Sequence, residues 1–242
     1  MTNPVFNQNA IDRERVLDSE PMTVNGAINK TFILFCLLLL SSLVVWDMFF
    51  KGYTDKVALL TMVGFISSII AFIVIMFNRN ALPIAAPVYA ASEGLLLGGI
   101  SAYIDKAYPG IAIQAVGLTL MALFSMLALY RVGAIRCTDK FRSVLFISTL
   151  SIAGIYLVNF IGSFFGMHIP QIFTSSNFGI GFSIVVVAIA SLNLIIDFDF
   201  IEQGAQNLLS KNFEWYGAFG LMVTLVWLYI EILNLLAKLR DR

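Results

Sequence analysis

Charged residues are scarce in this sequence: Asp, Glu, Lys and Arg together make up 12% of its 242 residues. Ordinary soluble domains carry about 25%, so the composition argues against a soluble fold. Basic and acidic residues are equal in number, 15 of each. This balance lacks the basic excess that is typical of nucleic-acid-binding proteins, and we expect no nucleic-acid partner.

Histidine and cysteine are almost missing. The single histidine, His168, excludes zinc sites that are built from several histidines. The two cysteines, Cys36 and Cys137, do not have metal-ligand spacing. The sequence also lacks GxSxG, a phosphate-binding loop and HExxH. We therefore expect neither an enzyme nor a bound cofactor.

Hydrophobic residues, in contrast, make up 59% of the chain. A membrane-spanning helix needs about 20 mostly apolar residues. Seven segments meet this requirement: 31–50, 57–77, 84–104, 111–130, 143–165, 178–198 and 214–237. The sequence predicts an all-α polytopic membrane protein embedded in the lipid bilayer. A flexible, polar, cytosolic tail, residues 1–27, would precede a seven-helix transmembrane domain, residues 28–240.

Lysine and arginine are distributed unequally over the predicted connections. With the N-terminus in the cytosol, nine of them lie on the cytosolic side and six on the other side. Cytosolic loops are generally the richer in these residues. The connection 131–142 alone holds four of them. We expect a cytosolic N-terminus and a C-terminus outside.

Small and polar residues recur on single faces of the predicted helices. In the third segment small residues stand four apart, which favours close helix packing: Ala86, Ala90, Gly94, Gly98 and Ala102. Faces of this kind also occur in the last three segments, and they predict a common interior. Their residues are Ser148, Ile152, Tyr156, Asn159 and Ser163; Gly179, Ser183, Ala190, Asn193 and Asp197; and Gly217, Gly220, Thr224, Trp227, Glu231, Asn234 and Lys238.

Four acidic residues lie within or at the ends of the predicted spans. Glu231 is deep in the seventh segment, Glu93 is near the middle of the third, and Asp197 and Asp199 are at the cytosolic end of the sixth. A carboxylate inside a membrane costs several kcal/mol and marks a functional site by default. The alternative for each is a structural role, either a hydrogen bond to a neighbouring helix or contact with headgroup water.

Carboxyl groups suit a particular chemistry in such a setting. Neighbouring buried carboxyl groups titrate as a unit, and their oxygens are ligands that suit Ca²⁺. We therefore interpret the four acids as ion-binding groups and pH sensors, at which protons and a divalent cation compete. Asp197 and Glu231 are the candidate Ca²⁺ ligands.

Two stretches resemble the Bax-inhibitor family, also called transmembrane Bax-inhibitor-motif proteins. They are 195–201, IIDFDFI, at the end of the sixth segment, and 228–236, LYIEILNLL, in the seventh. The stretches 142–165 and 214–221, EWYGAFGL, are similar to a bacterial subgroup of the family. The resemblance covers about residues 28–240.

The resemblance implies a central seventh helix wrapped by the other six, and a pH-sensitive calcium leak in the bacterial plasma (inner) membrane. It implies that an acid pair, here Asp197 and Glu231, is the sensor. Glu231 departs from the aspartate that is usual in the family. The resemblance also implies a basic residue on the second helix that latches the closed state. Arg79, just beyond that segment, is the candidate latch.

The spacing of the acids does not by itself bring them into contact. From a turn near residues 210–212, Asp197 lies about 14 residues back and Glu231 about 20 residues on. At 1.5 Å per residue their levels differ by roughly 9 Å. Direct contact needs a tilt, an asymmetric loop or an unwound turn. Otherwise water or a cation bridges the gap, or Glu93 is the nearer partner of Glu231.

The leading hypothesis is a pH-sensitive calcium leak channel, gated by protonation of the intramembrane acid pair, with Ca²⁺ as the transported ion. Two alternatives stay open. One is a non-conducting membrane regulator that binds a protease or a stress-response partner. The other is a proton-coupled cation transporter that uses the same acids.

Overall fold

Seven long helices make up most of the computed structural model, which describes residues 20–166 and 170–241. In chain order the elements are α2 (Val24–Phe50), α3 (Thr54–Phe77), the 3₁₀ turn η2 (Arg79–Ala81), α4 (Leu82–Ala107), α5 (Ile111–Arg131), α6 (Asp139–Phe164), the short α7 (Pro170–Phe173), α8 (Asn177–Gln206) and α9 (Asn212–Arg240). The seven helices other than η2 and α7 are long and apolar enough to cross a membrane. The predicted all-α fold with seven spans is confirmed.

The contacts of the chain divide it into two compact units. Unit 1 comprises Met1–Ala102 and Asp199–Met222, and unit 2 comprises Tyr103–Phe198 and Val223–Arg242. The boundary falls within α4, α8 and α9. These three helices also have the largest buried share of their most apolar window, 44–56% against 11–22% for the other four. The seventh span, α9, is thus among the most buried helices.

In unit 1, glycines of α4 pack against the backbone of α2. A Cβ atom added at Gly94 would lie 2.2 Å from the carbonyl oxygen of Leu38, and one at Gly98 would lie 2.6 Å from that of Ser42. No real side chain fits at such distances. The predicted close packing along the small-residue face of the third span is confirmed, and α2 is the helix that approaches it.

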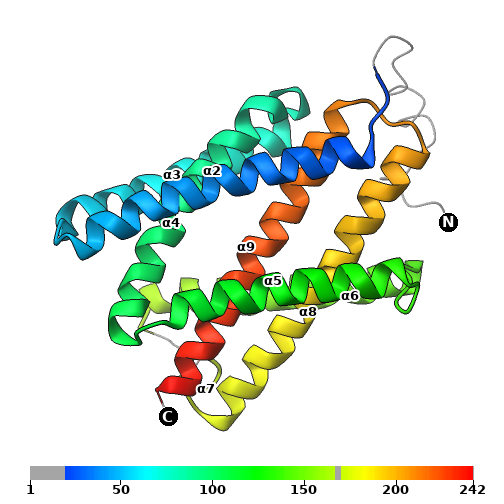
Figure 1. Cartoon of the computed structure of the whole chain (residues 1–242). Helices are drawn as coiled ribbons and strands as arrows, with labels where there is room; N and C mark the ends of the chain where they lie inside the picture. Colours follow the sequence, from blue (N-terminus) through cyan, green and yellow to red (C-terminus); the bar gives the residue numbers. More distant parts are fainter. Residues whose placement is uncertain (1–19, 167–169, 242) are drawn as a thin grey trace. The chain divides into compact units, whose positions relative to one another are not determined.

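Helices α3 and α4 pack in antiparallel register within unit 1. Going up α3, Thr61 faces Gly99, Gly64 faces the backbone of Ser92, and Phe72 lies against Tyr89. A Cβ added at Gly64 would lie 2.6 Å from the Ser92 carbonyl oxygen. Figure 1 shows α3 beside α2, to which it is joined by a short turn. Small residues on both α3 and α4 therefore set the closeness of this pair.

Two spans begin earlier than hydropathy predicts because threonine caps extend them. The Thr23 side chain accepts a hydrogen bond from the Gly26 backbone N–H at 2.9 Å, so α2 begins at Val24 and not near residue 31. Thr138 caps α6 in the same way through Phe141 N–H at 3.2 Å. A capped polar turn satisfies free N–H groups without adding hydrophobicity, so a hydropathy window misses it.

The end of α8 also differs from the expected one. The helix continues to Gln206, eight residues past the predicted end of the sixth span at 198. It therefore includes Asp199, which is 8% exposed and accepts a hydrogen bond from Gln203 Nε2 at 2.8 Å. Acidic residues lower hydropathy but do not end a helix, which is why the predicted boundary was too early.

The segment before α2 is fastened to the α8–α9 connection, again within unit 1. Met22 N–H donates to the Leu209 carbonyl at 2.7 Å, and Lys211 N–H donates to the Glu20 carbonyl at 3.1 Å. The side chains of Glu20 and Lys211 form an exposed ion pair. We call residues 20–23 the N-terminal strap. The rest of the predicted tail, residues 1–19, lies outside the described residues, as does His168.

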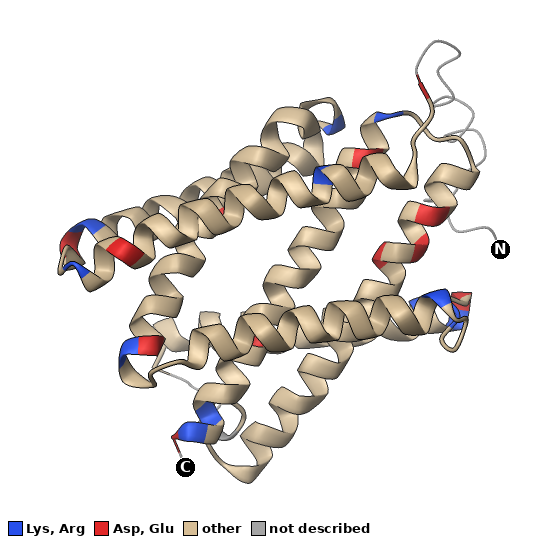
Figure 2. Cartoon of the chain, in the orientation of Figure 1, with Lys and Arg blue, Asp and Glu red and all other residues tan. Residues whose placement is uncertain are grey.

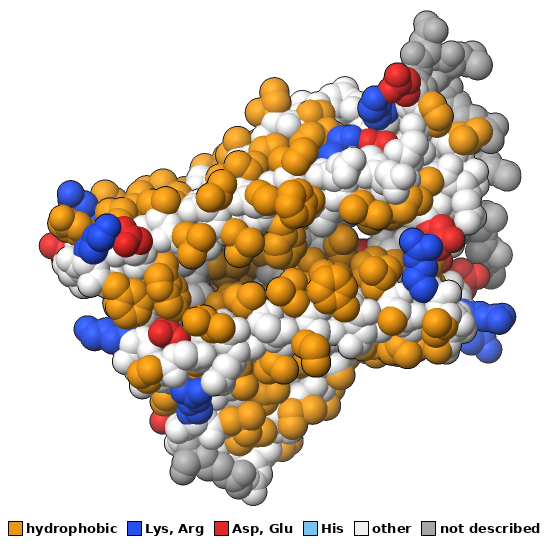
Figure 3. Space-filling view, viewed as in Figure 1, with side chains coloured by type: hydrophobic (Ala, Val, Ile, Leu, Met, Phe, Trp, Pro, Cys, Tyr) orange, Lys and Arg blue, Asp and Glu red, His pale blue; other side chains and the backbone are white. Residues whose placement is uncertain are grey.

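The surface has the character expected of a protein surrounded by lipid. Large apolar side chains are exposed along the long helices, among them Phe77, Ile84 and Ile113, and hydrophobic atoms cover much of the face in Figure 3. The charged residues are mostly at helix ends and connections (Figure 2). The acids that interrupt this pattern are therefore the ones that need an explanation.

Candidate functional site

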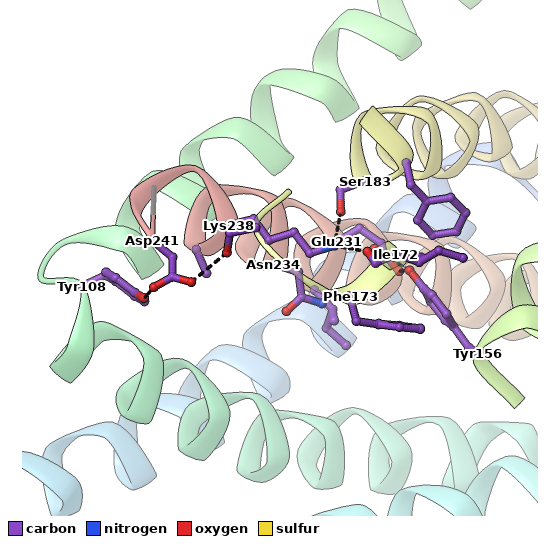
Figure 4. A pocket seen from close by; sticks show the side chains of 13 residues that line it. Tyr108, Tyr156, Ile172, Phe173, Ser183, Glu231, Asn234, Lys238 and Asp241 are labelled. Carbon is purple, nitrogen blue, oxygen red and sulfur yellow. Dashed lines mark hydrogen bonds between the residues drawn. The ribbon is translucent and has the colours of Figure 1, made fainter. Parts of the chain in front are cut away.

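Glu231 lies in α9 and is 2% exposed. Its carboxylate accepts hydrogen bonds from two neutral donors. The Tyr156 hydroxyl of α6 lies 2.8 Å from Oε1 and 3.0 Å from Oε2, and Trp227 Nε1, one turn earlier in α9, lies 3.1 Å from Oε1. Figure 4 shows the Tyr156 hydroxyl pointing at this carboxylate. The face of the fifth span that predicted a polar interior thus supplies the donor.

Lys238 is the nearest cation of the same helix face, seven residues after Glu231, or about 10 Å along α9. Its ammonium group donates to the carbonyl oxygens of Ile172 at 2.9 Å and Gly179 at 3.3 Å, and to Ser183 Oγ at 2.8 Å. These bonds occupy all three of its hydrogens. Lys238 therefore fastens α7 and the start of α8 to α9, and does not form a direct ion pair with Glu231.

A cavity of about 510 Å³ opens beside these residues. Its walls come from unit 2 and combine aromatic rings with a few polar groups, as Figure 4 shows. The lining residues are Tyr108, Tyr156, Ile172, Phe173, Ser175, Phe182, Ser183, Ile230, Glu231, Asn234, Ala237, Lys238 and Asp241. The size lies within the range of small-molecule pockets, and Glu231 is the buried acid on its wall.

The C-terminal end of α9 closes one side of this cavity. Asp241 accepts hydrogen bonds from Tyr108 Oη at 3.1 Å and from Ser175 Oγ at 2.7 Å. Arg240 donates to the Pro109 carbonyl at 2.8 Å and to Gln114 Oε1 at 3.1 Å. Because Asp241 accepts its hydrogen bond, the pKa of the Tyr108 hydroxyl is raised above its ordinary value. These contacts hold the end of the chain against the α4–α5 connection.

Asp197 lies in α8 of unit 2 and is half-buried as a residue. The Thr224 hydroxyl of α9 donates a hydrogen bond to its carboxylate. Its other oxygen, Oδ2, is buried and accepts no hydrogen bond from the described residues. Buried polar atoms are almost always hydrogen-bonded, so an unpartnered one needs an explanation such as an unseen ion or water.

The structure places Asp197 and Glu231 in one unit but at different levels. Asp197 is bonded at the level of Thr224, which is seven residues, or about 10 Å, before Glu231 on α9. The offset agrees with the roughly 9 Å expected from the sequence. In the described part of the chain, His, Cys, Asp and Glu form no group of three or more that could hold a metal ion.

The other predicted site residues belong to unit 1. Glu93 is 8% exposed in α4, and its partners are Tyr89 and Ser68. Asp199 is bonded to Gln203. Arg79, the candidate latch, lies in η2, where its guanidinium group is 5.8 Å from the ring centre of Tyr216. Its role as a latch stays a prediction.

An acid site that the sequence did not single out lies at the start of α9. Glu214 is 2% exposed, forms an ion pair with Lys30 of α2, and accepts from Thr23 N at 2.9 Å and Thr23 Oγ1 at 3.0 Å. All three residues are in unit 1. Thr23 could be read as a helix cap from the sequence, but nothing in the sequence indicated its contact with a residue 191 positions away.

Comparison with protein families gives a match over almost the whole chain. Residues 3–241 match the model of the family described as Bax inhibitor 1 like. Comparison with curated proteins gave no match. The family match covers both units and all the acids discussed above.

Proposed function

The chain belongs to the Bax inhibitor 1 like family, and on that premise we propose that it conducts Ca²⁺ across a membrane as a pH-sensitive leak. Asp197 and Glu231 are the protonatable groups of this proposal. Both lie in unit 2, on helices that are apolar enough to span a bilayer; Glu231 is buried, and Asp197 is half-buried with its Oδ2 buried.

One observation carries the proposal: the buried, unpartnered oxygen of Asp197. An ionised carboxylate left in this state costs free energy that either a proton or a cation removes. Thr224 supplies a single neutral hydrogen bond to the other side of the group. The site is thus suited to exchange between proton and cation, and not to a permanent ion pair.

The surroundings of Glu231 support the same exchange. Its donors, Tyr156 and Trp227, are neutral, and the Lys238 ammonium is occupied by three other acceptors. The charged form of the carboxylate is therefore stabilised by these hydrogen bonds and, without direct contact, by the charge of Lys238. Protonation of Glu231 would change its interactions with both α6 and α9.

Weak ion binding fits a leak better than tight binding does. A conducted ion must enter a site and leave it again, which a dense cage of ligands prevents. Ca²⁺ prefers 6–8 oxygen ligands, whereas the described acids offer no cluster of three. Asp197 and Glu231, about 10 Å apart in level, would act as two successive weak stations for the ion.

The proposal is tested by flux through purified protein in liposomes that contain a calcium-sensitive dye. We expect a Ca²⁺ flux that varies between pH 6 and 8, and a several-fold loss of flux or of its pH dependence in Asp197→Asn and in Glu231→Gln. Glu202→Gln is the matched control, because Glu202 is an exposed acid on the same helix as Asp197. Wild-type flux in both neutralised variants would contradict the proposal.

The two rival functions predict other results in the same assay. A non-conducting regulator of a protease or stress factor would give no flux from folded protein, and a partner would co-purify in fixed ratio. A proton-coupled transporter would move Ca²⁺ only while a proton gradient is maintained. A leak needs only the gradient of Ca²⁺ itself.

We also propose a bacterial plasma membrane as the location, with the N-terminus in the cytosol. The bacterial location rests on the resemblance of 142–165 and 214–221 to a bacterial subgroup, and the orientation rests on the four Lys and Arg residues of 131–142. Cys137, in the connection between α5 and α6, tests the orientation directly. In a Cys36→Ser background, Cys137 should resist a membrane-impermeant maleimide in intact cells. With both native cysteines replaced, Lys106→Cys should react. If Cys137 reacted and Lys106→Cys did not, the N-terminus would lie outside the cytosol.

A further inference from the structure

The cavity of unit 2 has more room than a bare ion needs. Its volume is about 510 Å³, which is the size of a small-molecule pocket and not of a site for one dehydrated ion. Every described residue on its wall belongs to unit 2. The proposed leak uses one of these residues, Glu231, and leaves the rest of the cavity without a role.

Three aromatic rings from three different helices gather around Tyr156 on this wall. The ring centre of Tyr156, in α6, lies 5.7 Å from that of Phe173 in α7 and 6.4 Å from that of Phe182 in α8. An aromatic face attracts an ammonium group that lies within about 6 Å of the ring centre. Ca²⁺, in contrast, is held by oxygen ligands, so the rings indicate a different kind of cation.

The carboxylate of Glu231 lies beside the same rings, because the Tyr156 hydroxyl is bonded to both of its oxygens at 2.8 and 3.0 Å. Its other donor is Trp227 Nε1 at 3.1 Å. These two neutral donors supply two hydrogens at most, whereas an ionised carboxylate has about four acceptor positions. Among the described residues, Glu231 thus has unused acceptor capacity and no direct ion pair.

The charges on the cavity wall are unequal. Of the described residues that line it, Glu231 and Asp241 are acidic and Lys238 is basic. The Lys238 ammonium gives its three hydrogens to two backbone carbonyls and a serine, so it has none left for an anionic ligand. The wall therefore favours a ligand that carries a positive charge.

We propose that this cavity is a binding site for an organic ammonium ion. The charged group of the ligand pairs with Glu231 and lies against the rings of Tyr156, Phe173 and Phe182. Asn234, an exposed amide on the same wall (Figure 4), meets a polar group at the other end of the ligand. The site goes beyond the proposed leak, because it requires no conduction of Ca²⁺. In a conducting chain the bound ammonium ion would displace Ca²⁺ from Glu231.

Binding of choline to the purified full-length protein tests the site. Choline has a quaternary ammonium group and a hydroxyl, and its uncharged isostere, in which carbon replaces the nitrogen, has the same shape. Ligand-detected saturation-transfer NMR measures both compounds. We expect saturable binding of choline and binding of the isostere that is at least about tenfold weaker. Equal binding of the two compounds, or no binding of choline, would overturn the proposal.

Two pairs of variants locate the binding in this cavity. Glu231→Gln should weaken choline binding at least about tenfold, whereas Glu202→Gln, at an exposed acid outside the cavity wall, should leave it unchanged. Phe182→Leu removes one ring, keeps both donors of Glu231, and should weaken binding about two- to fivefold. Its control is Phe178→Leu, because Phe178 lies one turn earlier on α8, is 63% exposed and is not on the cavity wall.

The pair of phenylalanine variants decides the matter if Glu231→Gln does not fold. Equal choline binding by Phe182→Leu and Phe178→Leu would then overturn the proposal.

The binding measurement is independent of the flux assay. Choline binding that depends on Glu231, without any Ca²⁺ flux, would support this site and contradict the leak. Flux of Ca²⁺ through a protein that does not bind choline would support the leak and contradict this site.

Discussion

Two glutamates on the same helix have opposite surroundings. Glu214, in unit 1, accepts hydrogen bonds from a backbone N–H and a hydroxyl and is paired with the Lys30 ammonium. Glu231, in unit 2, has a phenol and an indole as donors and no direct ion pair. Both are 2% exposed. Burial alone therefore does not identify a functional acid; the charge of its partners separates a structural carboxylate from one that can change its protonation state.

Replacing Lys30 gives the largest expected effect. In Lys30→Met the carboxylate of Glu214 stays buried without its cation, which should cost about 3–5 kcal/mol of the free energy of unfolding. The cost should be nearly constant across neutral pH. Detergent unfolding followed by circular dichroism measures it. Lys51→Met, which breaks the exposed pair with Asp47, is the control and should change stability by less than about 1 kcal/mol. Equal effects of Lys30→Met and Lys51→Met would mean that the buried pair is no more important than the exposed one.

Removing the phenol donor of Glu231 should have a smaller effect. Tyr156→Phe deletes one hydrogen bond to a charged group, which is worth about 1.5–3 kcal/mol. The loss should shrink as the pH falls and the carboxylate becomes protonated. The same unfolding measurement at pH 5 and pH 8 would show this. Tyr53→Phe, at an exposed tyrosine, is the control. If the effect of Tyr156→Phe on stability did not depend on pH, Glu231 would be a structural carboxylate like Glu214.

The same substitution at both glutamates sharpens the comparison further. Glu231→Gln removes a charge that has no direct counter-ion, so stability should change by no more than about 1 kcal/mol, while the pH dependence of Ca²⁺ flux is lost. Glu214→Gln leaves the Lys30 ammonium without its partner and should cost clearly more. Flux of Glu214→Gln should keep its pH dependence in whatever fraction stays folded. If Glu231→Gln cost more stability than Glu214→Gln, the assignment of Glu214 as the structural carboxylate and Glu231 as the functional one would be contradicted.

The smallest effect is expected at the N-terminal strap. The Lys211 ammonium holds the pKa of the exposed Glu20 carboxyl below its ordinary value of 4.5. Because this pKa is lower in the folded protein, the ion pair stabilises the fold fully above pH 4.5. That stabilisation is lost as the pH falls through the lowered pKa of Glu20. Hydrogen-exchange protection of the Met22 and Lys211 amides should decrease a few-fold under those acidic conditions. In Glu20→Gln the decrease should already be present at pH 7.

The sequence predicted the seven spans because each is a long apolar run, and lipid imposes that pattern directly. It did not predict the first turns of α2 and α6, since Thr23 and Thr138 extend these helices by hydrogen bonds and not by hydrophobicity. The close approach of α4 to another helix followed from the spacing of Gly94 and Gly98, although the identity of that helix, α2, did not.

For the candidate site, the sequence predicted that Glu231 is an acid inside the bundle but did not predict its partner on α6. Trp227 and Lys238 stand four residues before and seven after Glu231, so their shared face could be predicted from helical spacing. The donation from Tyr156 joins residues 75 positions apart, and the Lys30–Glu214 pair joins residues 184 apart. Such pairings depend on how helices pack, which local spacing does not encode.

The three hydrogen bonds of the Lys238 ammonium limit which residues can replace it. Its ammonium points hydrogens in three directions, at two backbone carbonyls and a serine. An arginine carries more donors, but they lie in one flat fork and cannot converge on acceptors arranged around a point. The exchange of lysine for arginine, which most surfaces tolerate, should be rejected at this position even though the charge is unchanged.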